Sequence, residues 1–415
     1  MPSISSTVPL RLRLATALVL ICGHKASSQE ADPPVDPGSQ VRRNPSTTFA
    51  KVVESHFAKW DLNHDGILEA SEIDALMNRQ DIRGEAAAAL AAIKRRERAI
   101  PLAERAQYTA SMDQLTGPAS DPEPVEPSSP RRIVPYELVF RHNVRTLSTL
   151  NRKLFAGDGP NFREMKQGPI GDCYFFSLTG YLAAREPKKL MRMITPEPDG
   201  GYLVQFFDGE QVRVAAPTDA EILVNNSASS LDDGIWLAVL EKALGKKMRR
   251  LVSAPKRTSE ATDAMALGGT TGLMIRLYSG HQDTKIRLRE SRYVRPRLDL
   301  LRRILPQILA RGMLASAEMG KKPLEGLPKT PGLGYGHAYA ILGYDPATDR
   351  IMLWNPWGQN FTPSGPEGYD HGFSTDHGIF QLSLRDFYYI FSSVHLETFS
   401  RAIQDDGPVH GFYGP

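Results

Sequence analysis

A twelve-residue segment, residues 61–72, constrains the fold of this chain more than any other part of the sequence. Oxygen-bearing side chains stand at alternate positions, and the segment closes on a glutamate. Ca2+ is a hard cation that takes about six to eight oxygen ligands, and this spacing wraps such ligands around one ion. The expected ligands are Asp61, Asn63, Asp65, the backbone carbonyl of Ile67, Glu69 and Glu72.

The residues on both sides of this segment are typical of helices. Apolar residues recur at helical spacing from Phe49 to Trp60, and residues 69–77 and 84–104 predict two further helices. Gly66 stands where such a loop turns sharply. The pattern predicts a calcium-binding EF-hand, and the alternative is a polar turn between two helices. Such loops usually occur in pairs, but the sequence shows no second one before residue 116.

Length and composition predict several domains in a globular chain. The 415 residues suggest two or three domains, and the net charge of +3 gives no reason to expect nucleic acid or an anionic membrane as a partner. We expect a monomer. The predicted order is a signal peptide (1–28), a disordered leader (29–46), a helical EF-hand module (47–115), a proline-rich linker (116–132), two further regions (133–272 and 273–400) and a tail (401–415).

The N-terminus predicts export. Arg11 and Arg13 precede an apolar run, residues 14–22, that is too short to span a bilayer. Small residues at 26–28 then offer a cleavage site, so we expect a secreted or periplasmic protein. A lipoprotein anchored at Cys22 is the alternative. Cleavage would leave Cys173 as the only thiol, and a buried, inert cysteine is the simplest interpretation of a lone thiol.

The surroundings of Cys173 suggest a chemical role for that thiol. Two glycines and a proline in residues 168–171 precede an apolar helical stretch that starts at the cysteine. A cysteine at a helix N-terminus feels the positive end of the helix dipole, which lowers its pKa. The backbone N–H of Cys173 and the side-chain amide of Gln167 are candidates for an oxyanion hole.

A base and a residue to orient it follow far along the chain. His337 opens a predicted strand after a glycine-rich loop, and Asn355 ends another strand before a proline. The Asn355 oxygen is suited to accept a hydrogen bond from the imidazole, with Trp357 as a shield from water. Each residue alone has an equally good structural explanation. Together they give the order Cys, His, Asn that thiol catalysis uses.

The second region is rich in strands and the first in helices, which predicts an α+β fold. A hairpin is expected at 202–207 and 211–215, because Asp208-Gly209 between two β-rich runs favours a tight turn. A helix is expected from Trp236 to Leu251. Further strands are expected at 313–318, 337–344, 350–354, 379–382 and 391–399. The pattern of the arginine-rich stretch 287–303 is typical of a helix.

Several of these segments resemble the catalytic core of the calpain family of papain-like cysteine proteases. They are residues 167–177 around the cysteine, 336–339 around the histidine and 355–358 around the asparagine, with support at 236–243, 268–272 and 376–387. The resemblance implies a two-subdomain endopeptidase acting on proteins or peptides, with Gln167 and Cys173 on the helical subdomain and His337 and Asn355 on the β-rich one. Tyr174 stands where the family usually has Trp.

Three questions stay open at this point. The resemblance allows further calcium sites in the core, but no ligands are assigned to them. A transglutaminase-like acyl transferase, or a catalytically silent calcium-binding interaction protein of the same fold, is the alternative function. The EF-hand either stabilises its own module or gates the protease, and the prolines of the linker favour the first role.

Overall fold

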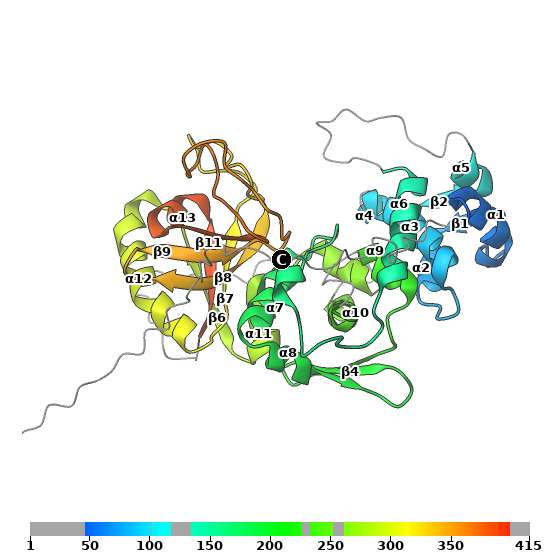
Figure 1. The fold of residues 1–415 in the computed structure, drawn as a ribbon, viewed down its shortest axis with the longest axis horizontal. Helices are drawn as coiled ribbons and strands as arrows, with labels where there is room; N and C mark the ends of the chain where they lie inside the picture. The colour runs from blue at the N-terminus through cyan, green and yellow to red at the C-terminus, as the bar shows by residue number, and fades with distance from the viewer. Residues whose placement is uncertain (1–45, 101, 118–133, 226–232, 252–260, 399–415) are drawn as a thin grey trace, which may run out of the picture. The chain divides into compact units, whose positions relative to one another are not determined.

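The computed structural model describes residues 46–100, 102–117, 134–225, 233–251 and 261–398 (Figure 1). The predicted signal peptide and C-terminal tail lie outside these residues, as do almost all of the leader and the linker, so export stays a prediction. No helix in the described ranges is long and apolar enough to cross a membrane.

The N-terminal part contains the helices that the sequence predicts around residues 61–72. Helix α1 starts after Thr48, whose hydroxyl caps it by accepting from the N–H of Lys51, and it buries Val53 and Trp60 on one face. Strand β1 pairs antiparallel with β2, with Leu68 opposite Ala110. The elements are α1 (Phe49–Trp60), β1 (Ile67–Glu69), α2 (Ala70–Met77), α3 (Gly84–Ala99), α4 (Leu102–Arg105), β2 (Thr109–Ser111) and α5 (Met112–Thr116).

The apolar core of this part extends beyond residue 115. Phe140 of α6 (Tyr136–Thr149) and Leu223 of α9 (Asp219–Asn225) belong to the same buried cluster as α1, α2 and α3. The buried Asn143 side chain donates to the carbonyl of Ala88 at 2.9 Å. Helices α1–α3 therefore bury their apolar faces against two helices that lie beyond the predicted linker.

The helical region of the core surrounds α7, which runs from Cys173 to Arg185. The predicted hairpin is confirmed as β4 and β5, and β3 adds a third antiparallel strand beside β4. The elements are η2 (Phe162–Glu164), α7, α8 (Pro187–Met193), β3 (Ile194–Pro196), β4 (Tyr202–Gln205), β5 (Gln211–Val214), α9, α10 (Trp236–Leu251), η4 (Thr262–Leu267) and α11 (Thr271–Ser279).

The last part forms a six-stranded antiparallel sheet in the order β10-β9-β8-β7-β11-β6. All five strands that the sequence predicts are present, so the described chain has the mixed α/β character expected. The elements are β6 (Gln282–Arg287), η5 (Ser291–Tyr293), α12 (Val294–Ala310), β7 (Ala315–Met319), β8 (His337–Asp345), β9 (Arg350–Trp354), β10 (Ile379–Ser383), α13 (Leu384–Ile390) and β11 (Ser393–Thr398).

One expected element is different. The stretch 287–303 was expected to be helical throughout, but α12 begins only at Val294, and Arg287 ends strand β6. Strand β6 lies at the edge of the sheet, and Ile286 is its only fully buried residue. Edge strands tolerate charged side chains, so the alternation that marks a strand is missing from the sequence here.

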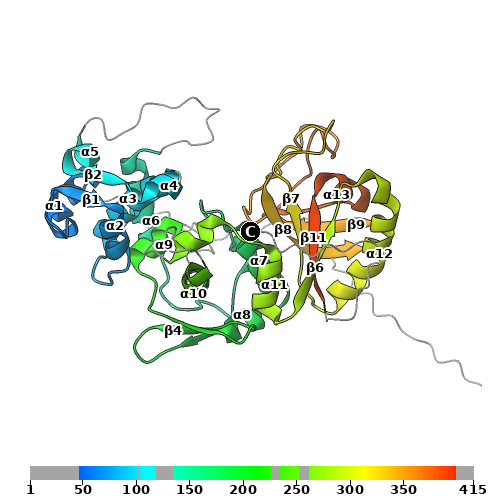
Figure 2. The same ribbon diagram turned by 180° about the vertical axis from the view of Figure 1, so that it is seen from behind.

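Helices cover both faces of this sheet. Helices α7 and α11 lie on one side, and α12 and α13 lie on the other, as both views show (Figures 1 and 2). Helix α7 approaches β9 closely at Gly180, where an added Cβ would lie 2.1 Å from the Trp354 ring. This close approach brings the start of α7 to the strands that carry His337 and Asn355.

Candidate active site and calcium loop

Cys173 is the first residue of α7, and the turn before it leaves backbone N–H groups available at the helix start. The Asp172 side chain is fully buried and does not cap the helix, while its carbonyl accepts from the N–H groups of Phe175 and Phe176. In the described part of the chain, the backbone N–H of Cys173 has no protein acceptor. The N–H of Tyr174 donates to the Cys173 sulfur.

His337 opens β8, and Asn355 directly follows β9. Asn355 Oδ1 lies 2.9 Å from His337 Nε2 and also accepts from the backbone N–H of Trp357 at 3.1 Å. An amide oxygen only accepts, so Nε2 carries the proton and the Nδ1 lone pair is left as the basic site. The Trp357 ring packs on the imidazole with centroids 4.5 Å apart, so it covers the ring as the sequence predicts.

The thiol lies beside the residue that follows this histidine. The backbone N–H of Ala338 lies near enough to the Cys173 sulfur to act on its pKa, so the start of α7 lies beside β8. Among the described residues, the thiol and the His337 ring share no direct hydrogen bond. The structure thus gathers Cys173, His337 and Asn355 in one place, although they are far apart in the sequence.

The pKa shifts of the two central groups oppose the expectation from the helix dipole. Burial raises the pKa of the Cys173 thiol, and the two backbone N–H donors offset this only in part. Burial lowers the pKa of His337 to about 4, although its hydrogen bond to Asn355 acts the other way. The expected lowering of the Cys173 pKa is therefore wrong for this structure, in which both shifts favour the neutral forms of the thiol and the imidazole.

Gln167 links the two loops of the site. Its backbone N–H donates to the carbonyl of Pro356 at 2.8 Å, which joins the loop before α7 to the loop after β9. Its side-chain Nε2 donates to the carbonyl of Ile170 at 2.8 Å. A primary amide carries two N–H donors, so this bond leaves the second one for another acceptor.

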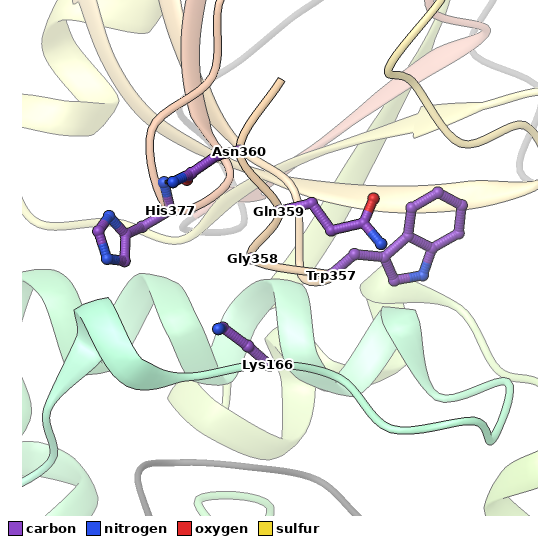
Figure 3. A pocket seen from close by; sticks show the side chains of 6 residues that line it. All are labelled: Lys166, Trp357, Gly358, Gln359, Asn360 and His377. Carbon is purple, nitrogen blue, oxygen red and sulfur yellow. The ribbon is translucent and has the colours of Figure 1, made fainter. Parts of the chain in front are cut away.

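A polar pocket of about 480 Å3 adjoins the site through Trp357 (Figure 3). Figure 3 shows Lys166 rising from the loop before α7 towards the chain at Gly358 and Gln359. Because the Trp357 ring also packs on His337, the pocket lies on the histidine side of the thiol. Its lining is Lys166, Trp357, Gly358, Gln359, Asn360 and His377.

A comparison with protein families identifies this core. The family model described as calpain family cysteine protease matches residues 139–366, which is more than half of the chain. The chain belongs to the calpain family of cysteine proteases. The matched region includes Gln167, Cys173, His337 and Asn355, so the chain carries a cysteine peptidase domain, and such a domain implies protein substrates. No curated protein matches the chain detectably.

N-terminal to the matched calpain-family region, the segment 61–72 folds as a tight loop closed by its own carboxylates. Gly66 has φ +84°, a left-handed conformation that favours glycine. Asp61 accepts from the backbone N–H groups of Asp65 and Gly66, and Glu72 accepts from those of Leu62 and Glu69. Several carboxylate and amide oxygens thus turn into one loop, and this donor set fits Ca2+.

The structure pairs strand β1 with a short strand that the sequence analysis does not predict. Strand β2 pairs with β1, and the reciprocal capping box of Ser111 and Gln114 repeats the one formed by Glu69 and Glu72. Counting back from the paired residues Leu68 and Ala110 places Ala103 at the position of Asp61. Residues 103–114 therefore pair with the loop through their strand, but they lack acidic side chains at the ligand positions. For that reason the calcium-loop pattern is not recognisable there.

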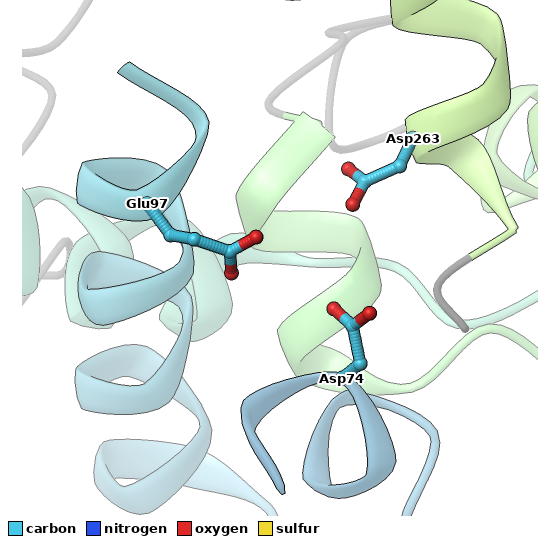
Figure 4. A group of neighbouring side chains, drawn as sticks. All are labelled: Asp74, Glu97 and Asp263. Carbon is cyan, nitrogen blue, oxygen red and sulfur yellow. The ribbon is translucent and has the colours of Figure 1, made fainter. Parts of the chain in front are cut away.

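An acidic group lies between this module and the protease core (Figure 4). The carboxylates of Asp74, Glu97 and Asp263 surround Lys94, whose Nζ lies 2.5, 2.8 and 2.9 Å from them. The ammonium group already supplies the cation, so this cluster is an ion network. The sequence analysis does not predict this ion network, although Lys94 lies on the buried face of α3 together with Leu90.

The carboxyl groups of this cluster differ in their pKa shifts. Burial and the neighbouring carboxylates raise the pKa of Glu97 to about 7, since Lys94 opposes them only in part. Burial also acts to raise the pKa of Asp263, but Arg98 and Lys94 together lower it to about 2. Burial alone would lower the pKa of Lys94, yet the three carboxylates raise it above its ordinary value. Asp263 is thus the anion to which the two cations are tied.

Proposed function

We propose that this protein is a calpain-like cysteine endopeptidase with Cys173 as nucleophile, His337 as base and Asn355 as the residue that orients it. The observation that carries the proposal is the packing of α7, which begins at Cys173, against β8, which begins at His337, with the N–H of Ala338 near the sulfur. The bond from His337 Nε2 to Asn355 supports it, because that bond leaves Nδ1 basic.

In this proposal, the Cys173 sulfur attacks the peptide carbonyl carbon while its proton passes to His337 Nδ1. The two groups start neutral, so the proton moves during attack and the thiolate is not formed in advance. The N–H of Cys173 and the second Nε2 hydrogen of Gln167 stabilise the oxyanion. His337 then protonates the leaving amine, and water hydrolyses the thioester to release the acid and the thiol.

The wild-type protein tests this function directly. We expect it to hydrolyse denatured casein, and an epoxide inhibitor of thiol proteases should stop the hydrolysis and label Cys173 in a peptide map. A transglutaminase-like enzyme would instead attach a labelled amine to glutamine residues. Amine incorporation without cleavage, or neither reaction, would overturn the endopeptidase assignment.

We further propose that residues 61–72 bind one Ca2+ ion. Asp61, Asn63, Asp65, Glu69 and Glu72 would supply side-chain oxygens and Ile67 its carbonyl. The proposal is supported by the inward-turned carboxylates and by the left-handed Gly66. Calcium bound here would compensate the crowded negative charges of the loop. Residues 103–114 would act as a metal-free partner, so binding should show one site without cooperativity.

Calorimetric titration with Ca2+ should show one site with a Kd on the order of 10⁻⁴ to 10⁻³ M, the range of extracellular EF-hand modules. Glu72→Gln should abolish it, because the amide keeps an acceptor for the loop N–H groups but loses the charged bidentate ligand. Glu54→Gln, on the exposed face of α1, is the matched control and should bind normally. Binding that survives in Glu72→Gln would contradict this ligand set.

A further inference from the structure

A buried ion network joins the EF-hand module to the catalytic core. Lys94 lies on α3 of the module and is fully buried, and its ammonium contacts Asp74 of α2 and Asp263 of η4. Asp263 belongs to the protease core, well beyond the predicted linker. The module and the core are therefore tied by a desolvated charge contact as well as by the chain.

Arg98, one helical turn after Lys94, extends this network into the core. Its guanidinium donates to Asp263 at 2.6 Å, to the Thr262 hydroxyl at 2.8 Å and to the Asn225 side chain at 3.0 Å. Asn225 in turn donates to the fully buried Glu241 of α10 at 3.2 Å. One guanidinium thus holds both η4 and the end of α9, and its planar fork suits such a multiple contact.

Helix η4 reaches the nucleophile through Tyr174. The Tyr174 hydroxyl donates to the carbonyl of Met265 in η4 at 3.4 Å. Gly269, just after η4, packs on the Tyr174 ring so closely that an added Cβ would lie 2.5 Å from it. Tyr174 directly follows Cys173, and its N–H contacts the sulfur. A shift of η4 therefore displaces the wall against which the nucleophile is held.

The other end of the network begins at the calcium loop. Asp74 lies on α2, which starts at Ala70, and Glu72 in its first turn closes the loop. Asp74 and Glu72 are both buried, and they lie on the same short helix. A change in the loop that turns α2 is thus passed to Lys94 and then to Asp263.

We propose that Lys94 and Arg98 are positioning residues for the Cys173 nucleophile, and that the loop 61–72 acts on the protease through them. This inference rests on the proposed function. It gives the EF-hand an effect on the active site, whereas the proline-rich linker alone favoured a role in stabilising its own module. The route runs through buried ion pairs, so it does not depend on the residues of the linker.

Arg98→Met in the full-length chain tests the inference, with Arg79→Met as matched control. Arg79 belongs to the same module, and within the described ranges its guanidinium pairs with the exposed Asp81 alone. We expect Arg98→Met to slow alkylation of Cys173 by iodoacetamide, and to lower kcat, by about three- to thirty-fold with KM little changed. The control should match wild type. A folded Arg98→Met protein with wild-type alkylation and kcat would overturn the inference.

Tyr174→Phe provides a second test if Arg98→Met does not fold. It removes only the hydroxyl that bonds to Met265, so we expect the ring to stay in place and alkylation to slow about two- to ten-fold. An unchanged rate would count against the proposed route. If alkylation depends on Arg98 but wild type cleaves no peptide, the endopeptidase proposal fails while the positioning of the thiol stands.

Calcium supplies a readout that does not depend on turnover. We expect saturating Ca2+ to raise the rate of Cys173 alkylation in wild type and to leave it unchanged in Arg98→Met. Because coupling between two sites is reciprocal, alkylated wild type should also bind Ca2+ with an affinity changed from that of the free protein. Wild-type alkylation that is indifferent to calcium would overturn the action of the loop on the thiol.

Discussion

We expect Cys173→Ala to abolish peptide hydrolysis while the protein stays folded. The alanine removes the sulfur that forms the thioester, and loss of a nucleophile costs about 10⁶-fold in kcat in enzymes of this kind. Only the first residue of α7 changes, and Cys173 is partly exposed, so the buried packing of the helix is kept. Hydrolysis of a fluorogenic peptide measures the effect, and circular dichroism checks the fold.

Cys173→Ser is the matched variant for this experiment. Serine nearly preserves the size of the side chain and still offers a hydroxyl, but a hydroxyl is far less acidic and a weaker nucleophile than a thiol, so a site arranged for a thiol does not activate it. We therefore expect both variants to be inactive. A Cys173→Ala protein with the wild-type rate would refute the assignment of the nucleophile.

We expect Lys94→Met to destabilise the protein by about 3–5 kcal/mol, the usual cost of removing one partner from a buried ion pair. Methionine fills much of the space of the lysine stem but removes the ammonium group that contacts the buried Glu97 carboxylate. Urea unfolding followed by fluorescence measures the difference. Lys51→Met, at an exposed position of α1, is the control and should change stability little.

The Lys94→Met defect should shrink as the pH falls. Glu97 already has a pKa of about 7 in the native protein, and losing Lys94 raises it further, so the folded variant binds protons that the unfolded chain does not. Between that raised value and about pH 7, the folded variant gains a proton on Glu97 that the wild type does not yet bind, so the deficit narrows as the pH falls towards 7. A variant that is less than about 1 kcal/mol destabilised at neutral pH would show that the buried network does not hold the two parts together.

Much of the candidate site was predictable because short sequence patterns mark its residues. The loop 61–72 places every expected oxygen ligand within one short segment, so its spacing alone predicts a calcium site. Cys173 stands at the start of an apolar helix, and His337 and Asn355 stand at strand ends. The ends of helices and strands can be predicted from the spacing of apolar residues and from turn residues, because both patterns involve only a few neighbouring positions.

Other features depend on contacts that no local pattern encodes. The sequence places Cys173 at a helix N-terminus, but only the tertiary structure decides how deeply it is buried, and burial reverses the expected direction of its pKa shift. The pairing of β1 with β2 is another case, because residues 103–114 have lost the ligands that would mark a second loop.

Local sequence patterns alone predict the chemistry proposed for this protein: a candidate calcium loop, and a thiol, an imidazole and an amide in the order of a calpain-type core. How these parts are connected depends on contacts between distant segments. Lys94 and Arg98 look like solvated charges of a basic helix end, but folding buries Lys94 among three carboxylates and aims Arg98 at Asp263. Such contacts are strong and specific because the charged groups are removed from water. That removal happens only when distant segments of the chain have packed together.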